Sequence, residues 1–229
     1  MGVRVWLSRE SPETPAPAVE QLSTDGAAAA VTETAPAVVN AASLDWHSLE
    51  AVVSRCRSCD LHRGRTQTVF GTGDHDAQWM IIGEAPGAEE DRQGEPFVGR
   101  AGQLLNSMLQ AAGFKRREVY IANIVKCRPP DNRDPRAEET AACGGYLARQ
   151  IELVNPKIIL AVGRVAAQCL LQSDTPVGRM RGKLHRYGDK PGIPVIVTYH
   201  PAYLLRSPRE KRKVWQDLLF ALEQSEAVA

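Results

Sequence analysis

Four of the five cysteines in this chain are spaced in a way that suits metal ligands. Cys56 and Cys59 form a Cys-x-x-Cys pair, and Cys127 and Cys143 follow much later in the chain. Four thiolates can bind zinc or an iron–sulfur cluster. Zinc ribbons usually offer two tight knuckles, whereas the second pair here spans a loop and the start of a predicted helix, which favours the cluster. The alternative is that Cys127 and Cys143 are ordinary buried thiols.

The fifth cysteine, Cys169, lies in the apolar segment VAAQCLL and is predicted to be a core residue. The N-terminus lacks the apolar stretch of a secretory signal, and cysteines without secretion favour thiols or metal ligands over disulfides. No apolar run is long enough to span a membrane. We therefore expect a cytoplasmic protein without a membrane partner.

Four short segments are apolar and rich in β-branched residues, which predicts buried strands. They are Trp79–Gly83, Val119–Val125, Lys157–Gly163 and Ile193–Tyr199. Helices are predicted at Ala101–Ala112, Arg136–Val154, Val165–Leu171 and Ser207–Glu223. This alternation predicts an α/β fold, a three-layer α/β/α sandwich with a mostly parallel four-stranded central sheet.

Residues capable of chemistry stand at the ends of these predicted strands. The first strand ends in GEAPG, from Gly83 to Gly87, the second contains Asn123, the third ends in Gly163, and the fourth leads into His200. Ligands of open parallel sheets bind outside the carboxyl ends of the strands. We therefore expect these residues to converge on one site.

The first 43 residues differ in composition from the rest. They are rich in Ala, Pro, Thr and Glu and show no sustained periodicity, so residues 1–43 are predicted to be a disordered tail. Residues 44–229 are predicted to form the single folded domain, with Ser43 as the N-cap of a helix through LDWHSLEAVVSRC.

Net charge is only +1, but the basic residues are unevenly distributed. Residues 100–136 hold eight basic side chains and three acidic ones. Such a stretch points weakly to a phosphate-bearing partner, and a solvated charged face is the alternative.

Several segments, taken in order, resemble one enzyme family. CRSC, GEAPGAEEDRQGEPFVGRAGQLL, YIANIVKCRPPDNRDP and HPAYLLR resemble the family 4 uracil-DNA glycosylases, and the resemblance runs from about Leu44 to Leu219. It implies a monomeric, monofunctional enzyme that hydrolyses the N-glycosidic bond of uracil in single- or double-stranded DNA and leaves an abasic site. It also implies a structural 4Fe-4S cluster. The implied cluster ligands are Cys56, Cys59, Cys127 and Cys143.

A glycosylase must flip its base into a pocket, and three residues fit that task. Phe97 in GEPFVGRAG is the candidate stacking surface. Asn123 can accept from uracil N3–H and donate to O4, and His200 can donate to O2 as the bond breaks. The alternatives are a core phenylalanine, a structural amide and a histidine packed at a strand end.

Glu84 is the candidate for orienting water and for excluding the methyl group of thymine. The family 1 enzymes carry an Asp and a Tyr in the comparable motif, whereas Ala85 and Gly87 stand here, so those roles do not carry over from family 1. The backbone at Gly83, Ala85 and Gly87 is expected to approach the substrate. Gly87 leaves open a different target, such as hypoxanthine or a mismatched base.

Candidate DNA contacts come from the basic stretch and from HPAYLLR. Phosphate contacts are predicted at Arg100, Lys126, Arg128, Arg133 and Arg136. Lys126 is interpreted as such a contact and not as the catalytic lysine of a lyase. Leu204 to Arg206 could wedge into the base stack, or the two leucines could be an apolar pair that caps a helix.

Two further functions remain open at this stage. One is a non-enzymatic iron–sulfur DNA-binding module that senses redox state. The other is a zinc-stabilised nuclease, although the sequence offers no cluster of carboxylates suited to two metal ions.

Overall fold

The structure is a computed structural model, and it describes residues 41–227. The predicted disordered tail therefore lies outside the described residues except at its end. There, Ala41–Ser43 form the short 3-10 helix η1, and Ala41 is buried. The folded domain thus includes at least three residues that were predicted to belong to the tail.

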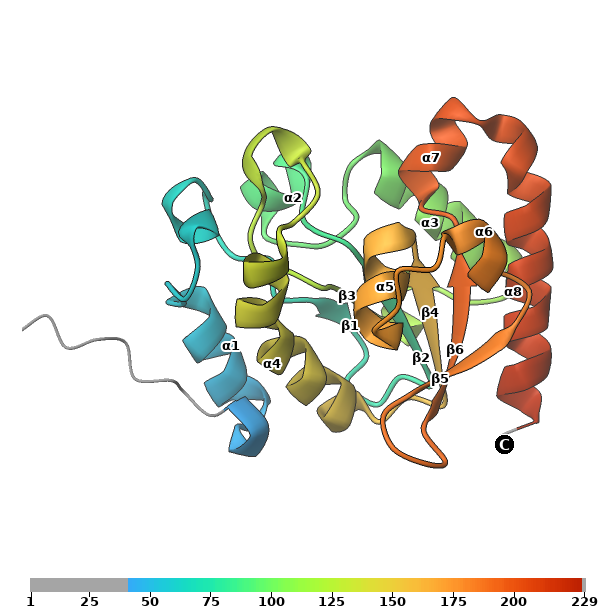
Figure 1. Ribbon diagram of the computed structural model, residues 1–229, viewed down its shortest axis with the longest axis horizontal. Helices are drawn as coiled ribbons and strands as arrows, with labels where there is room; N and C mark the ends of the chain where they lie inside the picture. Colours follow the sequence, from blue (N-terminus) through green and yellow to red (C-terminus); the bar gives the residue numbers. More distant parts are fainter. Residues whose placement is uncertain (1–40, 228–229) are drawn as a thin grey trace, which may run out of the picture. The chain divides into compact units, whose positions relative to one another are not determined.

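A six-stranded sheet forms the centre of the molecule, in the order β1-β3-β2-β4-β6-β5 (Figure 1). The strands are β1 (Thr72–Gly73), β2 (Trp79–Gly83), β3 (Tyr120–Asn123), β4 (Ile158–Val162), β5 (Leu184–Tyr187) and β6 (Ile193–Thr198). The four strands predicted from sequence are the parallel centre of this sheet. The prediction of four strands in total was wrong, because β1 and β5 add an antiparallel edge on each side.

Helices cover both faces of the sheet, which confirms the predicted three-layer α/β/α sandwich. They are α1 (Trp46–Ser54), α2 (Ala88–Gln93), α3 (Arg100–Ala111), α4 (Ala137–Val154), α5 (Arg164–Leu171), α6 (Val177–Met180), α7 (Pro201–Arg206) and α8 (Lys211–Glu226). Four further 3-10 turns are η2 (Asp60–Arg63), η3 (Arg116–Glu118), η4 (Pro130–Asn132) and η5 (Pro208–Glu210). None of the helices between residues 41 and 227 is both long and apolar enough to cross a membrane.

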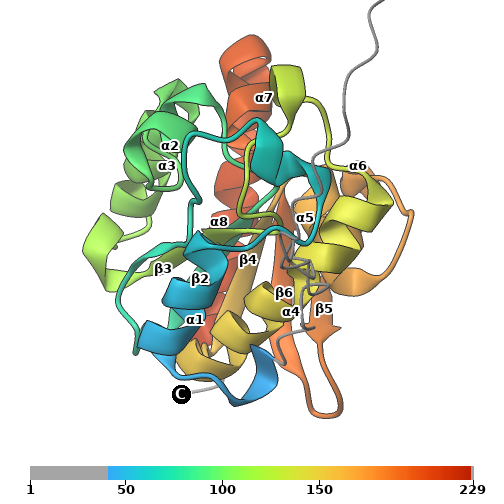
Figure 2. The same cartoon turned by 90° about the vertical axis from the view of Figure 1, so that its left-hand side faces the viewer.

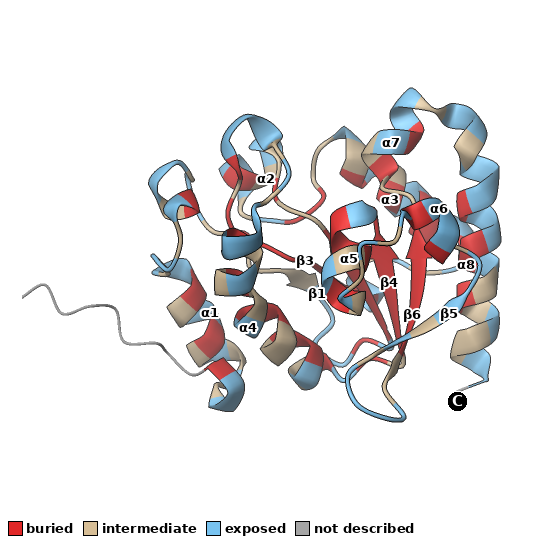
Figure 3. Cartoon of the chain, viewed as in Figure 1, coloured by how far each residue is buried: buried red, intermediate tan, exposed pale blue. Residues whose placement is uncertain are grey.

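Alternate residues of each central strand face opposite layers. Met80 and Ile82 of β2 pack with buried residues of α1, α4, α5 and α6, whereas Trp79 and Ile81 pack with those of α3, α7 and α8. This is the two-residue period of a strand buried on both faces. Figure 2 shows α1 and α4 on one side of the sheet and α8 on the other, and Figure 3 shows the strands buried between helices whose outer faces are exposed.

Two predicted helix starts differ from the structure. Asp45, not Ser43, caps α1, because its carboxylate accepts a hydrogen bond from the Ser48 amide at 2.8 Å. The helix predicted from Ser207 is divided into η5 and α8. Pro208 at the start of η5 has no amide hydrogen, which suits the first turn of a helix.

The strand ends meet at one edge of the sheet. Gly83 of β2 lies opposite Asn123 of β3 in parallel register, and the Ile124 amide donates to the Gly83 carbonyl at 2.9 Å. Because β3 lies on one side of β2 and β4 on the other, the chain reverses its direction across the sheet at β2. Open α/β sheets bind ligands outside such a reversal.

Candidate functional site

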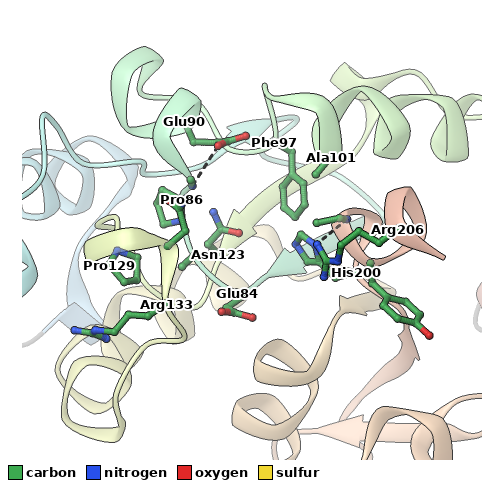
Figure 4. A pocket seen from close by; sticks show the side chains of 15 residues that line it. Glu84, Pro86, Glu90, Phe97, Ala101, Asn123, Pro129, Arg133, His200 and Arg206 are labelled. Carbon is green, nitrogen blue, oxygen red and sulfur yellow. Dashed lines mark hydrogen bonds between the residues drawn. The ribbon is translucent and has the colours of Figure 1, made fainter.

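A cavity of about 470 Å³ lies beyond the carboxyl ends of β2, β3 and β6 (Figure 4). The predicted residues that line it are Glu84, Ala85, Gly87, Phe97, Asn123, Arg133, His200 and Arg206. Residues that the sequence analysis did not single out also line it, namely Pro86, Glu90, Ala101, Pro129, Asn132, Ala202 and Tyr203. The structure therefore brings together residues from four separate parts of the chain.

Asn123 is the last residue of β3 and is 1% exposed. Its Oδ1 is the one buried side-chain oxygen or nitrogen atom between residues 41 and 227 that has no hydrogen-bond partner. Buried polar atoms are nearly always paired, and an unpaired one calls for an explanation. A ligand that brings a donor into the cavity would satisfy this oxygen.

Gly83 is buried and is not among the residues that line the cavity, and its approach to substrate stays a prediction. A Cβ atom at Gly83 would lie 2.5 Å from Asn123 Oδ1 and 2.5 Å from Phe97 Cζ. Real Cβ atoms do not approach other atoms so closely, so only glycine lets these two side chains meet here.

His200 is the N-cap of α7, and its ring is held in one orientation. Its Nδ1 accepts a hydrogen bond from the Ala202 amide at 3.1 Å. Burial, followed by the nearby positive charge of Arg206, lowers the pKa of His200 to about 4. The imidazole is therefore neutral near pH 7, and because Nδ1 accepts, its single proton is on Nε2.

Phe97 lies beside His200 with its ring almost parallel to the imidazole. The ring centroids are 5.5 Å apart and the planes are inclined by 29°. Phe97 is 5% exposed and its φ is +54°, a left-handed conformation that a bulky residue rarely adopts. The ring thus forms a flat apolar wall of the cavity. Its backbone conformation is unfavourable unless neighbouring residues stabilise it.

Glu84 follows β2 and is an unusual carboxyl group. Burial, followed by the nearby carboxyl of Asp134, raises the pKa of Glu84 to about 7, while Arg164 opposes this shift. Arg164 also forms an ion pair with Asp134. A carboxyl with a pKa near neutrality can both accept and release a proton, which suits general base chemistry.

Lys126 is not a DNA contact, which corrects the sequence prediction. It is 1% exposed, and its Nζ donates to the Asn123 carbonyl at 2.9 Å and to Gln150 Oε1 at 2.6 Å. Gln150 in turn donates to the Tyr120 hydroxyl and to the Phe70 carbonyl. Lys126 therefore supports the end of β3 from within the core.

The remaining predicted DNA contacts are arginines that differ in exposure and in whether the guanidinium already binds another side chain. Arg100 and Arg206 are exposed, and Arg136 is exposed with Glu138 3.8 Å away. Arg128 donates to Asn132 Oδ1 at 2.8 Å. The guanidinium of Arg133 is held by both carboxylate oxygens of Glu139, at 2.6 and 2.8 Å, so its charge is already paired.

The predicted wedge needs a correction at its first residue. Leu204 is 1% exposed and packs in the core, so it cannot enter a base stack. Tyr203 and Leu205, on either side of it, are each 38% exposed. If α7 carries a wedge, these two side chains are the ones placed to form it.

Four cysteines line a second, apolar cavity between α1, α4 and the segment after β3. They are Cys56, Cys59, Cys127 and Cys143. Cys143 Sγ accepts from the Lys126 amide at 3.3 Å, and Cys127 Sγ accepts from Arg65 at 3.0 Å. Within residues 41–227, no three His, Cys, Asp or Glu side chains are arranged around a point as ligands of a single metal ion.

Cys169 was predicted to be a core residue, and this prediction was wrong. Its neighbours Ala167 and Leu170 are buried, but Cys169 is exposed. Cys169 lies on the outer side of α5, and the apolar composition of the segment gave no indication of this exposure.

Sequence reasoning missed Glu90, whose carboxylate binds three backbone amides around the cavity. They belong to Gly87 at 3.2 Å, Val98 at 3.0 Å and Gly99 at 2.9 Å. Gly87 is the N-cap of α2 and Glu90 is its third residue. A glutamate three residues after an N-cap is a recognised signal for a hydrogen bond to the N-cap amide, so the sequence pattern predicts the bond to Gly87.

Comparison with known proteins agrees with this geometry. The family model of the uracil DNA glycosylase superfamily matches residues 70–219. A type-4 uracil-DNA glycosylase of Archaeoglobus fulgidus is 45% identical over 172 residues, which cover 72% of this chain and 85% of the relative. One of Thermotoga maritima is also 45% identical, over 72% of this chain and 87% of the relative.

A third type-4 uracil-DNA glycosylase, from Pyrobaculum aerophilum, is 41% identical over 76% of this chain and 92% of its own length. The matched region contains the cavity and its supporting strands. With a family model that spans most of the domain and relatives covered almost in full, the chain belongs to the uracil DNA glycosylase superfamily and, within it, to the type-4 family.

Proposed function

We propose that this chain is a monofunctional DNA glycosylase that hydrolyses the N-glycosidic bond of uracil in DNA and leaves an abasic site. The observation that carries the proposal is the buried, unpaired Oδ1 of Asn123 in the wall of the cavity. A uracil flipped out of the DNA would bring its N3–H donor to this oxygen. The names of the type-4 relatives support the same substrate.

Asn123 would read the edge of the base. Its side-chain amino group donates to uracil O4 while Oδ1 accepts from N3–H. Cytosine carries an amino group at that position and no hydrogen on N3, so it would leave both groups of the amide unpaired. Buried polar groups left unpaired are costly, and this difference discriminates strongly between similar substrates. The ring of Phe97 would stack on the base face.

His200 would stabilise the departing base. As the bond from C1′ to N1 breaks, its electron pair moves onto the uracil ring, and negative charge develops on O2. A neutral imidazole with its proton on Nε2 can donate a hydrogen bond to that oxygen. A donor already in place for developing charge is among the strongest contributions to catalysis.

Glu84 would position the attacking water. Its carboxylate accepts a proton from a water molecule as the oxygen adds to C1′, and the base leaves with the bonding electrons. Burial and then Asp134 raise the pKa of this carboxyl to about 7, while Arg164 opposes the shift, so the group titrates near neutral pH. Glu84 is also the side chain proposed to exclude the methyl group of thymine.

Basic residues that are exposed or half-buried would hold the DNA backbone. Arg100 at the start of α3 and Arg206 at the end of α7 lie on elements that border the cavity, and Arg128 lies on the loop that contains Pro129. Phosphate contacts of this kind position a duplex without reading its sequence.

The four cysteines around the second cavity would hold a 4Fe-4S cluster with a structural role. Four thiolates bound to one zinc ion must converge to about 2.3 Å from its centre, whereas a cluster takes one thiolate at each of four separate irons. The proposal is supported by the one cavity that all four cysteines line, and by the hydrogen bonds that its thiol sulfurs accept from Arg65 and from the Lys126 amide.

Replacement of Asn123 by aspartate tests base reading. The change substitutes an acceptor for the amino group that faces O4, so excision of uracil should fall by about 10²-fold or more, while a cytosine substrate gains a possible partner. The assay uses labelled oligonucleotides that contain uracil, cytosine, thymine or hypoxanthine. Excision of uracil by Asn123→Asp at the wild-type rate would show that Asn123 does not read the base.

His200→Ala should slow the chemical step by about 10²–10³-fold, as is typical for loss of one such donor. The measurement is the single-turnover rate on a uracil oligonucleotide. DNA affinity should change far less, because the bond strengthens mainly as charge develops. His47→Ala, which changes an exposed histidine on α1, is the matched control. Weakened affinity with a normal single-turnover rate would move His200 from catalysis to binding.

The pH dependence of excision should report Glu84. Its raised pKa of about 7 means that the active carboxylate form is lost as the pH falls, so the single-turnover rate should drop about tenfold per pH unit below pH 7 and level off above it. The pKa of His200, about 4, leaves that residue neutral over the same range. Glu84→Gln should be slow and independent of pH, and a sloping profile in that variant would assign the titration to another group.

The cluster proposal is tested by metal content. The purified protein should be brown and contain about four irons per chain. Cys56→Ala and Cys127→Ala should lose iron and much of the soluble protein, because the ligands tie distant segments together. Cys169→Ala is the matched control and should keep both, since that residue is exposed on α5. Zinc in place of iron after anaerobic purification would contradict the proposal.

A further inference from the structure

The conformation of Phe97 requires support that its own sequence does not supply. A left-handed φ of +54° is unfavourable for a residue with a bulky side chain, and it persists only where the surroundings fix it. Phe97 stands between Pro96 and Val98 in a loop that leads into α3. Whatever fixes the two peptide units next to Phe97 also fixes its ring.

Arg116, at the start of η3, holds this loop from one side. Its guanidinium donates to the carbonyl of Pro96, and to the carbonyl of Phe97 at 3.3 Å. The same group donates to Asn106 Oδ1 of α3 at 3.1 Å. A guanidinium offers several donors in one rigid plane, so it can hold neighbouring carbonyls and a side chain at once.

Glu90, on α2, holds the loop from the other side. One carboxylate oxygen accepts from the amides of Val98 and Gly99, at 3.0 and 2.9 Å. The other accepts from the Gly87 amide at 3.2 Å, in the GEAPG segment (Figure 4). Glu90 therefore connects the two segments that form the apolar wall and the GEAPG side of the cavity.

Together these bonds define both backbone angles of Phe97. Peptide units are planar, so the orientation of one carbonyl or amide fixes the whole unit. Arg116 fixes the unit before Phe97 through the Pro96 carbonyl. Arg116 and Glu90 fix the unit after it, through the Phe97 carbonyl and the Val98 amide.

We propose that Arg116 and Glu90 act as a pair of positioning residues that hold the Phe97 ring in place to receive the flipped base. This inference rests on the proposed glycosylase function and names residues that set its geometry. Neither side chain needs to touch the reacting atoms. Their effect on the reaction passes through the backbone of Phe97 and, for Glu90, through the Gly87 amide.

The first test is a double-mutant cycle with the full-length protein on a uracil oligonucleotide. Arg116→Met and Glu90→Met should each lower kcat/KM about tenfold or more, because each removes every hydrogen bond made by a charged group. Arg116→Lys keeps the charge but not the planar fork, so it should not restore activity. The matched controls are the exposed neighbours, Arg117→Met and Glu89→Met, which should stay within twofold of wild type.

The double-mutant cycle is completed by making the Arg116 substitution in a Phe97→Leu background. If Arg116 acts through the Phe97 ring, its substitution should cost less than about twofold once the ring is gone. An equal loss in both backgrounds would overturn the proposal. Thermal unfolding of each variant shows whether its lower kcat/KM comes from a fraction of unfolded protein. The kcat/KM of such a variant is then measured and compared with wild type at a temperature at which the variant is folded.

A second measurement does not depend on activity. Amide hydrogen exchange at Val98 and Gly99 should accelerate in Glu90→Met and Arg116→Met and stay unchanged in the two controls. Unchanged exchange in Glu90→Met and Arg116→Met would overturn the proposal, even if excision falls. If the wild-type protein releases no uracil, the proposed function fails, whereas the exchange result still decides whether these two residues hold the loop.

Discussion

The neighbouring side chains of the site can pack together because Gly83 has no side chain. Parallel pairing places this glycine opposite Asn123, and the Phe97 ring fills the space that a Cβ would take. The Asn123 amide and the Phe97 ring can therefore lie side by side because β2 ends in glycine. A Cβ atom at position 83 would require Phe97 or Asn123 to move, and the Phe97 ring already lies 5.5 Å from that of His200.

The two cavities are connected through the same strand end. Lys126 binds the carbonyl of Asn123 with its side chain and the sulfur of Cys143 with its backbone amide. Cys127 follows directly, so the segment that leaves β3 lines first the cavity at Asn123 and then the cysteine cavity. A group bound by the four thiols would thus fix the position of Asn123 without taking part in the reaction. This arrangement gives a structural cluster a physical reason to lie in an enzyme of this kind.

Much of the fold followed from sequence because the central strands are buried on both faces. Continuous apolar runs such as Trp79–Gly83 carry a strong signal, and the residues at their ends are placed by the parallel topology alone. The edge strand β5 was missed because its residues are only half-buried or exposed, so its sequence LHRY lacks that signal.

Individual side chains were harder to place than strands. Lys126 is charged and lies in a basic stretch of sequence. The neighbouring residues do not indicate that its side chain is buried and donates to Gln150 and to a backbone carbonyl. Leu204 and Leu205 are identical in type, and only the rotation of a short helix decides that the first is buried and the second exposed. Such outcomes depend on contacts between distant segments, which composition and spacing do not encode.

Several polar side chains that line the cavity carry no free charge, whereas Arg206, which also lines it, is exposed. Glu90 gives its carboxylate to three backbone amides, and Arg133 is paired with Glu139, so neither presents a free charge to a ligand. His200 is neutral, and Asn123 is a neutral amide. Among these cavity residues, Glu84, directly after β2, has a pKa of about 7, raised by burial and then by Asp134. In the proposed reaction uracil leaves as an anion, and neutral hydrogen-bond donors already in place can stabilise that charge. The Glu84 carboxylate would act on the sugar side of the same reaction, where positive charge develops and a negative group is favourable.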